Sequence, residues 1–458
     1  MNNKLSLKFK ESFYNIKERM EGYLLIYNTK TGAFIAVEEK YISKIDSIFQ
    51  NPDFYVDDND FRTLKENGFI VESFIDELED VKNTYFTGKH DTNSLDLTML
   101  ASENCNFRCP YCFIYEQRGF NMKDGVYESV HKLIDKKLSK DGFLRINWFG
   151  GEPTLAKDKI INFMILLKEK SKKIGFSFKS SIITNGYLLD FNSFLEYLNS
   201  GISDFQITVD GWEETHNKTR VLKNGEGTFN VIWNNLVNIR RNSKNLNFSL
   251  TIRCNFLDNA NDSINKLIKN FLEEFGNDKR FNIVFKPVYY FETKTNEVEK
   301  ISAEVLELKE GQLKQIEYGL SLKNFCEYSQ YLFGILPAPI SFWCLAEKNN
   351  SFIINADGSV GKCDTYTGNP DKVCGKITVD GDMVLNNKKF EWDFNVYETE
   401  EYLYKCSKCK YLPICQGGCA RGRKNRIKND NCYYNKDIIK TAMIKYHKFM
   451  MENKTSLM

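Results

Sequence analysis

The chain has 458 residues, of which 42% are hydrophobic and 14% aromatic. A domain has roughly 100–200 residues, so we expect about two to four domains. This hydrophobic content can fill a sizeable core, which excludes wholesale disorder. The 63 Lys and Arg residues against 61 Asp and Glu leave a formal net charge of +2. Charge therefore gives no reason to expect a nucleic acid or an anionic membrane as a partner.

Cysteine content and the N-terminus indicate the compartment. The sequence has no uninterrupted apolar run long enough to span a membrane, and residues 1–13 lack the apolar region of a secretion signal. We therefore predict a cytoplasmic protein with no membrane partner. Thirteen cysteines in that compartment are expected as reduced thiols, and their clustering predicts metal or iron–sulfur ligation. Only four histidines are present, and they are scattered, so the predicted ligands are all thiolates.

The first 85 residues are predicted to form a small module. Its expected elements, in order, are a hairpin over 22–37, a helix over 38–49, a second helix over 60–67 capped by Gly68, and a strand over 69–71. The acidic residues 76–80 and the polar residues 87–93 are expected to form the link to the next domain.

From residue 95 to 300, strands alternate with helices. The predicted strands are 95–100, 143–149, 176–183, 204–209, 248–254 and 281–286. The predicted helices between them are 127–138, 159–171, 191–199, 228–241 and 262–275. Six such units predict an α/β fold with a parallel sheet and outer helices. Because six units are too few for an eight-stranded barrel, we expect an open (βα)6 partial barrel that binds ligands at the C-terminal strand ends.

The alternation stops after residue 300. A helical bridge is predicted over 301–343, followed by a cysteine-dense domain over 344–458. Nine of the 13 cysteines lie between Cys326 and Cys432. Short loops around many cysteines are typical of a domain held together by metal rather than by a large core.

Three cysteines follow the first barrel strand. Cys105, Cys109 and Cys112 fall within eight residues, and their thiolates suit three irons of a 4Fe–4S cluster whose fourth iron stays open for a ligand. The alternative is a zinc site. Zinc usually takes four protein ligands, commonly as paired CxxC units, so three cysteines without a nearby histidine fit it poorly.

This motif resembles the CxxxCxxC signature of the radical S-adenosylmethionine (SAM) superfamily, in which an aromatic residue precedes the third cysteine. Similar family elements follow successive strands: a Gly-Gly-Glu motif, a Thr-Asn-Gly motif, and a segment like S-x-D-G…H-D-x-x-R in which Thr208 replaces the usual serine. The resemblance implies SAM bound to the open iron, cleaved by an electron from a flavodoxin- or ferredoxin-type donor to give a 5′-deoxyadenosyl radical. The residues that it implies as SAM contacts are Tyr111, Gly150, Gly151, Glu152, Asn185, Thr208 and Arg220.

The cysteines of the C-terminal domain resemble the SPASM extension of radical SAM enzymes that act on peptides and proteins. This resemblance implies two auxiliary 4Fe–4S clusters, and so three clusters in all. The implied ligands are Cys344, Cys363 and Cys419 for an inner cluster and Cys406, Cys409, Cys415 and Cys432 for an outer one. A zinc ribbon would explain only four of these seven cysteines.

The inner cluster is one ligand short. Some relatives carry a fourth cysteine at the position of Asn350. Either Cys374 or Cys326 closes the cluster, or its fourth iron is open to a substrate thiolate, since sulfur is a preferred ligand. Cys254, inside a predicted strand, is expected in the core.

Asp364 and a basic run are two further features of this domain. Asp364 stands where anaerobic sulfatase-maturating enzymes carry a catalytic Asp, so it is a candidate catalytic residue, although we favour a surface loop. The basic run over 421–428 lacks interleaved aromatic residues, and we predict a solvated loop rather than a nucleic-acid site.

The N-terminal module resembles the winged-helix-like elements of enzymes that mature ribosomally made peptides. Such elements bind a leader peptide as an added strand; a structural cap is the alternative. We therefore predict a peptide maturase that abstracts hydrogen from a carbon of a precursor peptide, with a Cys thioether of the sactipeptide or ranthipeptide kind as the favoured product. The alternatives are sulfatase maturation to formylglycine, carbon–carbon crosslinking, and a non-catalytic iron–sulfur carrier.

Overall fold

The computed structural model describes residues 8–291, 293–295, 297–322, 335–398, 400–423, 427 and 432–454. Cys326 lies outside these residues. The chain divides into two compact units, each built from separate segments. The first unit comprises Met1–His90, Tyr331–Lys348 and Phe394–Met458, and the second comprises Asp91–Gln330 and Asn349–Asp393. No helix in the described part of the chain is long and apolar enough to span a membrane.

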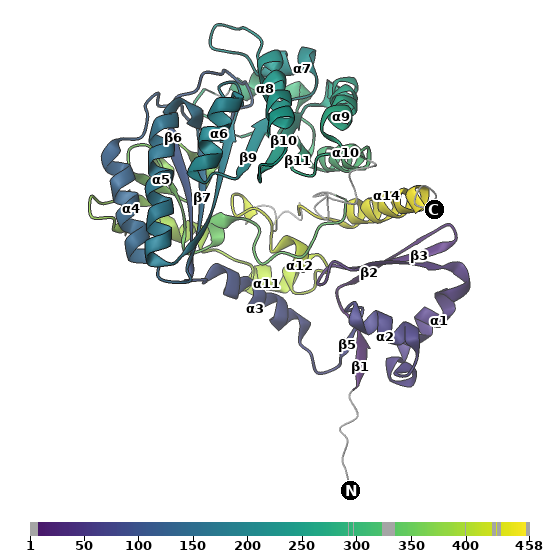
Figure 1. The fold of residues 1–458 in the computed structure, drawn as a ribbon. Coiled ribbons are helices and arrows are strands. Elements are labelled where there is room, and N and C mark those ends of the chain that lie inside the picture. The colour runs from purple at the N-terminus through teal and green to yellow at the C-terminus, as the bar shows by residue number, and fades with distance from the viewer. Residues whose placement is uncertain are drawn as a thin grey trace. The chain divides into compact units, whose positions relative to one another are not determined.

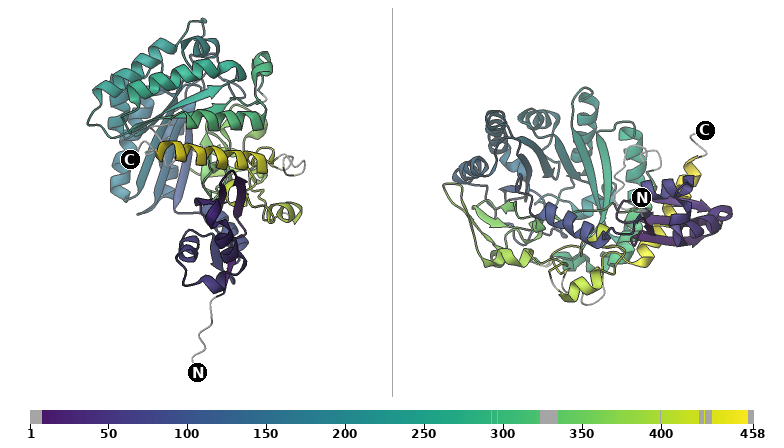
Figure 2. Two further views of the ribbon diagram at one scale, coloured as in Figure 1. Left: turned by 90° about the vertical axis from the view of Figure 1, so that its right-hand side faces the viewer. Right: turned by 90° about the horizontal axis from the view of Figure 1, so that it is seen from below.

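The second unit contains the predicted parallel sheet. Its six strands, paired in chain order, are β6 (Ser94–Ser102), β7 (Phe143–Gly150), β8 (Ser177–Thr184), β9 (Asp204–Thr208), β10 (Ser249–Phe256) and β11 (Phe281–Pro287). The helices between them are α4 (Asp124–Lys137), α5 (Lys157–Ile174), α6 (Phe191–Ser200), α7 (Glu213–Thr219), α8 (Phe229–Asn242) and α9 (Asn261–Phe275). Figures 1 and 2 show helices along the outer side of the curved sheet. The predicted parallel alternation is confirmed.

The two faces of this sheet differ in chemistry. In β10 every second residue is buried, namely Leu250, Ile252, Cys254 and Phe256. Cys254 is thus a core residue, as predicted. The residues in between, Arg253 and Asn255 among them, face the inside of the barrel and line a cavity. The period of two therefore supplies an apolar outer face for the helices and a polar inner face for a ligand.

The sheet continues past β6. Strand β12 (Ser351–Ile354) pairs with β6 in parallel, and β13 (Ser359–Gly361), β14 (Gly375–Ile377) and β15 (Met383–Leu385) follow in antiparallel order to make a mixed, ten-stranded sheet. Residues 349–393 therefore belong to the barrel unit, whereas the sequence predicted one domain over 344–458. The physical reason is that β12 satisfies the backbone groups that β6 would otherwise leave unpaired at a sheet edge.

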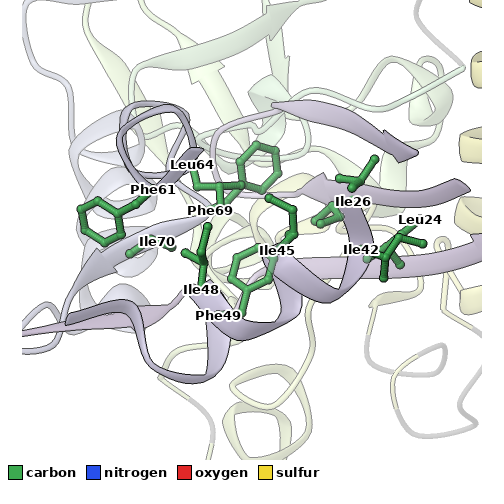
Figure 3. Packing of buried hydrophobic residues seen from close by; sticks show 11 residues of the cluster. Leu24, Ile26, Ile42, Ile45, Ile48, Phe49, Phe61, Leu64, Phe69 and Ile70 are labelled. Carbon is green, nitrogen blue, oxygen red and sulfur yellow. The ribbon is translucent and has the colours of Figure 1, made fainter. Parts of the chain in front are cut away.

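The first unit starts with short strands and helices. Strands β1 (Phe9–Glu11) and β5 (Ile70–Glu72) pair antiparallel, and β2 (Asn15–Met20), β3 (Tyr23–Asn28) and β4 (Phe34–Glu38) form a meander. The predicted hairpin is thus confirmed, while the polar strand β2 was missed. Helices α1 (Glu39–Gln50) and α2 (Asn59–Glu66) close a hydrophobic cluster with β3 and β5, and Figure 3 shows its side chains meeting from both helices and the strands.

Helix α3 (Glu77–Lys89) replaces the predicted link. The side chain of Asp76 accepts hydrogen bonds from the backbone N–H groups of Leu78 and Glu79, each at 3.1 Å. Asp at an N-cap and acidic residues in the first turn both favour a helix start. The acidic run that suggested a linker is therefore a helix N-terminus.

The N-terminal strands share a core with the C-terminal segment. Helices α11 (Glu400–Cys406), α12 (Leu412–Cys415) and α14 (Lys436–Lys454) belong to the same unit. Leu25 and Tyr27 of β3 pack with Ile414, Ile439 and Met443. Residues 1–85 are therefore part of a larger unit rather than a separate module, and a likeness to a winged helix stays a prediction.

The bridge predicted over 301–343 contains the end of a 3₁₀ segment and α10 (Leu308–Leu320), which packs on β11. Residues 323–334 of this predicted bridge lie outside the described part of the chain. The 3₁₀ segments are η1 (Pro52–Tyr55), η2 (Pro153–Ala156), η3 (Asp258–Ala260), η4 (Glu297–Glu304), η6 (Leu345–Glu347), η7 (Asp364–Tyr366), η8 (Pro370–Lys372) and η9 (Asn387–Trp392).

Candidate functional site

A cavity of about 190 Å³ lies at the C-terminal ends of the barrel strands. This is the position predicted for a parallel α/β sheet. Predicted site residues that line it are Cys105, Cys109, Tyr111, Cys112, Gly150, Gly151, Glu152, Asn185, Thr208, Arg220 and Asp364. Residues that sequence reasoning missed also line it, among them Phe113, Phe149, Phe291, Arg253 and Asn255. In the sequence, the only indication of these residues is that they alternate with apolar residues along a strand or lie in a loop after a strand.

The three cysteines after β6 meet in this cavity. Burial raises the pKa of the Cys105 and Cys109 thiols to about 12, and repulsion from neighbouring thiolates adds to the shift. A metal ion bound in place of the thiol protons would offset the cost of burying the ionised thiolates. Three thiols in one cavity are a soft donor set that suits iron. In the described parts of the chain, no three His, Cys, Asp or Glu side chains gather as ligands of a single ion; a four-iron cluster spreads its ligands over several metal atoms.

The Gly-Gly-Glu turn presses against the loop that carries Cys105. The backbone N–H of Gly151 donates to the Ser102 carbonyl and that of Glu152 to the Asn104 carbonyl, both at 2.8 Å. A Cβ at Gly151 would overlap the carbonyl of Asn104. Glycine is required here because the backbones of two loops approach closely. The sequence predicted close approach to SAM; the structure adds close approach to the cysteine loop.

Glu152 joins the loops after β7 and β8. Its carboxylate is buried and accepts hydrogen bonds from the Thr154 and Thr184 hydroxyls, each at 2.6 Å, and from the Asn185 backbone N–H at 2.7 Å. Burial raises the pKa of Glu152, and these hydrogen bonds oppose the rise. The Asn185 amide also donates to the Asn106 side chain at 2.7 Å, next to Cys105. Glu152 and Asn185 therefore hold three loops of the cavity together.

Arg220 provides a buried positive charge in the cavity wall. Its guanidinium donates to the Tyr111 hydroxyl at 2.9 Å, and that hydroxyl donates to Asp210. Burial opposes the charge of Arg220, but Tyr111 and Asp210 help to raise its pKa well above the usual value. Arg220 is 8% exposed, and its Nε has no hydrogen-bond partner in the described chain. A buried cation that lines a cavity suits an anionic group such as a carboxylate.

Asp364 lines the cavity from the start of the short segment η7. It is accessible to solvent there, and the surrounding protein still raises the pKa of its carboxyl, while Arg253 acts in the opposite direction. Arg253 is held by a hydrogen bond of 2.8 Å to Asn255. The cavity thus combines a carboxylate that can accept a proton with three thiols and a cation.

Four cysteines of the tail also come together. Burial raises the pKa of Cys406 and Cys415 to about 12, and repulsion from Cys409 and Cys432 adds to both shifts. All four cysteines of the predicted outer set belong to the first unit, and their role as cluster ligands stays a prediction.

The predicted inner set is divided between the two units. Cys344 and Cys419 belong to the first unit, and Cys363 to the second. Cys374 is buried in the second unit, where its thiol faces the Lys372 carbonyl at 3.6 Å. The assignment of these ligands stays a prediction.

The predicted solvated loop over 421–428 is wrong for Arg423. This side chain is fully buried and paired with Glu347. Residues 424–426 and 428 lie outside the described part of the chain.

Comparison with known proteins agrees with this geometry. Residues 99–269 match the model of the radical SAM superfamily. The chain is 26% identical over 360 residues to a cysteine-type anaerobic sulfatase-maturating enzyme of Clostridium perfringens, covering 72% of this chain and 90% of that protein. It is 25% identical over 353 residues to the Clostridium novyi counterpart, covering 72% and 88%.

Two solved structures share the fold. One is native anSMEcpe with bound AdoMet and Cp18Cys peptide, with a TM-score of 0.53 and 23% identity over 80% of this chain and 98% of that one. The other is Streptococcus suis SuiB bound to S-adenosylmethionine, with a TM-score of 0.50 and 14% identity over 91% and 96%. The cysteine loop after β6 and the match over residues 99–269 thus have one explanation: the chain contains a radical SAM domain and is similar to cysteine-type anaerobic sulfatase-maturating enzymes.

Proposed function

We propose that this enzyme oxidises a Cys or Ser residue of a peptide, as sulfatase maturation requires, with Asp364 as the proton acceptor. The observation that carries the proposal is that Asp364 lines the same cavity as Cys105, Cys109 and Cys112. The relatives named above favour this alternative over the thioether that the sequence analysis preferred. The solved relative with a bound Cp18Cys peptide supports a peptide as the substrate class.

The residues of the cavity divide the work of binding and orientation. When bound, SAM and its 4Fe–4S cluster supply the one-electron chemistry that removes a hydrogen atom from a substrate carbon. Arg220, which lines the cavity, would bind the carboxylate of SAM, and Tyr111 and Asp210 hold its guanidinium in place. Glu152 keeps the loops after β7 and β8 in register with the cysteine loop.

The far wall of the cavity would receive the reacting residue. Asp364 accepts the proton from the substrate thiol or hydroxyl, and Arg253 favours its ionised form. The rings of Phe113, Phe149 and Phe291 form an apolar wall, with neighbouring ring centroids 6.0 Å apart. Such a wall shields the substrate radical from bulk water until the second electron has left. The predicted auxiliary clusters would supply an acceptor for the second electron of the oxidation.

Mass spectrometry of a cysteine peptide separates the possible products. Enzyme reconstituted with iron and sulfide is incubated with SAM, a reductant and the peptide. Conversion of Cys to formylglycine removes two hydrogens to give a thioaldehyde, which water hydrolyses to the aldehyde with release of hydrogen sulfide, whereas a thioether keeps sulfur and loses two hydrogens. We expect the first product. Asp364→Asn should still cleave SAM but should not oxidise the peptide, and equal oxidation by this variant would contradict the role of Asp364.

A second proposal is that β4 binds the leader of a precursor peptide. Such binding would suit any reaction that matures a peptide. Among the described strands, β4 pairs with β3 alone, so its other side is an edge. The backbone bonds Asn28 N–H to Ala33 and Glu39 N–H to Gly22, each 2.9 Å, define the hydrogen-bonded pairs. In an antiparallel ladder the pairs alternate, so the N–H and carbonyl of Ala36 point to the open edge. An extended peptide can add there as a strand.

Point variants suit this question better than deletion of residues 1–85, because β3 shares a core with the C-terminal helices. Ala36→Pro removes one outward N–H, whereas Ala36→Thr keeps it. The probe is a labelled library of extended synthetic peptides that each contain one cysteine. We expect weaker peptide binding only for Ala36→Pro. If both variants bind the peptide equally well, the N-terminal strands serve only as a structural cap.

A further inference from the structure

The first unit contains an ion pair with no access to solvent. The guanidinium of Arg423 lies 2.7 Å from the carboxylate of Glu347, and both side chains are 0% exposed. Arg423 sits in the basic run after Cys419, and Glu347 lies three residues after Cys344. Neither residue has a part in the cavity of the barrel unit.

Each member of the pair holds the backbone beside a predicted cluster ligand. The Glu347 carboxylate accepts the backbone N–H groups of Trp343 at 3.1 Å and Cys344 at 3.3 Å. Arg423 donates through Nε to the carbonyl of Gly418 at 3.0 Å, and a second guanidinium nitrogen donates to the same oxygen. Gly418 directly precedes Cys419, so one ion pair links the turns of two cysteines that are 75 positions apart in sequence.

Further contacts leave the pair little freedom. The Tyr85 hydroxyl of α3 donates to Glu347 at 3.0 Å, and Arg423 donates to the Phe394 carbonyl at 3.0 Å. Gly417 packs directly on Arg423: a Cβ there would lie 3.1 Å from the arginine Cδ and Nε, and its φ of +82° favours glycine. The loop before Cys419 is therefore shaped around the arginine side chain.

A buried ion pair is a poor way to gain stability. Its loss of hydration offsets most of the attraction, and well-packed apolar residues of similar size often stabilise a fold as well or better. Such a pair does fix orientation, because the hydrogen bonds of arginine and carboxylate groups are directional and hold the backbone groups that they bind.

We propose that Arg423 and Glu347 are positioning residues for the inner auxiliary cluster, holding the turns of Cys344 and Cys419 in place before iron binds. This inference rests on the auxiliary clusters of the proposed function. It assigns a role to two residues that contact neither substrate nor SAM, and it explains why a basic residue in an apparently solvated run is buried.

The test is the iron content of reconstituted protein. Three clusters require about twelve irons per chain. Glu347→Gln and Arg423→Lys should each lower the content to about eight, remove one signal from the low-temperature EPR spectrum of the reduced protein, and leave SAM cleavage in place. Arg280→Lys is the matched control, because Arg280 also donates to backbone carbonyls but does so in the barrel unit at the start of β11. It should keep all twelve.

A double variant separates positioning from folding. Glu347→Met with Arg423→Met replaces the pair by apolar side chains of similar length, which should leave the melting temperature of the apoprotein close to that of wild type. We expect this folded variant to lose the same cluster. Full iron content and an unchanged spectrum in the double variant, or in both single variants, would overturn the positioning role while leaving the clusters intact. Wild-type protein with about four irons would instead remove the auxiliary clusters themselves.

Discussion

Replacing Gly151 by alanine should break the contact between the Gly-Gly-Glu turn and the loop that carries Cys105. The new Cβ would lie 2.7 Å from the Asn104 carbonyl carbon and 3.2 Å from the Cys105 Cβ. Backbone atoms must therefore move by several tenths of an ångström or more. Two backbone hydrogen bonds of 2.8 Å cross this contact.

The size of the effect follows from these contacts. Losing the two hydrogen bonds costs about 2 kcal/mol, taking about 1 kcal/mol for each. Overpacking adds about 1–3 kcal/mol. We expect Gly151→Ala to destabilise the native arrangement by about 3–5 kcal/mol, or to relieve the overlap by displacing Cys105 from its place beside Cys109 and Cys112. Either way, the cluster next to SAM should bind poorly.

Iron analysis and SAM cleavage provide the assay. The variant should lose about four irons per chain and most 5′-deoxyadenosine formation, while the tail clusters remain. Gly125→Ala in α4 is the matched control, because a Cβ there meets nothing within 4 Å and alanine favours a helix. If Gly151→Ala keeps its iron, its activity and its melting temperature, the two loops do not depend on this close approach.

Three further outcomes are expected. Arg220→Lys removes the fork that suits a carboxylate and should weaken SAM binding about 10- to 100-fold by equilibrium dialysis; unchanged affinity would show that Arg220 does not bind SAM. Tyr111→Phe removes the hydroxyl between Asp210 and Arg220 and should weaken SAM binding about tenfold with little change in melting temperature; a loss of stability without a loss of affinity would make the hydroxyl purely structural. His131 stacks on Phe163, and burial lowers its pKa to about 4. The unfolded chain, with an ordinary histidine pKa near 6.5, binds more protons between those values, so stability should fall as the pH falls through that range. The loss from pH 7 to pH 5 is about 2 kcal/mol, and His131→Phe should remove that part of the pH dependence of denaturant unfolding; the same pH dependence in both proteins would contradict the assignment.

Local pattern was enough to predict the barrel and its cysteine loop. The strands β6 to β11 have apolar residues at most alternate positions, and the segments that connect these strands show a helical period, so each element carries its own signal. Parallel strands then bring their C-terminal ends to one edge, which is why the predicted SAM contacts and the three cysteines line a common cavity. Spacing alone also separated the tail cysteines from Cys254, which lies in the core.

Other features depend on contacts between distant segments. Nothing near residue 351 shows that β12 will extend the barrel sheet, because that pairing depends on the free edge of β6. The motif around Thr208 includes Asp210, but only the fold shows that Asp210 accepts a hydrogen bond from Tyr111. Arg423 looks like part of a solvated basic run, and only the approach of Glu347 and Gly418 makes its burial possible.

There is a physical reason why some features can be predicted from the sequence and others depend on the tertiary structure. Secondary structure and metal-ligand spacing are set by interactions within a few residues, so the chain displays them directly as periods and motifs. Burial of a charge depends on whether a partner arrives from elsewhere in the chain, since an unpaired buried charge is too costly to persist. That partner is chosen by tertiary packing, and so the roles of Asp210, Glu347 and Arg423 are decided only in the folded molecule.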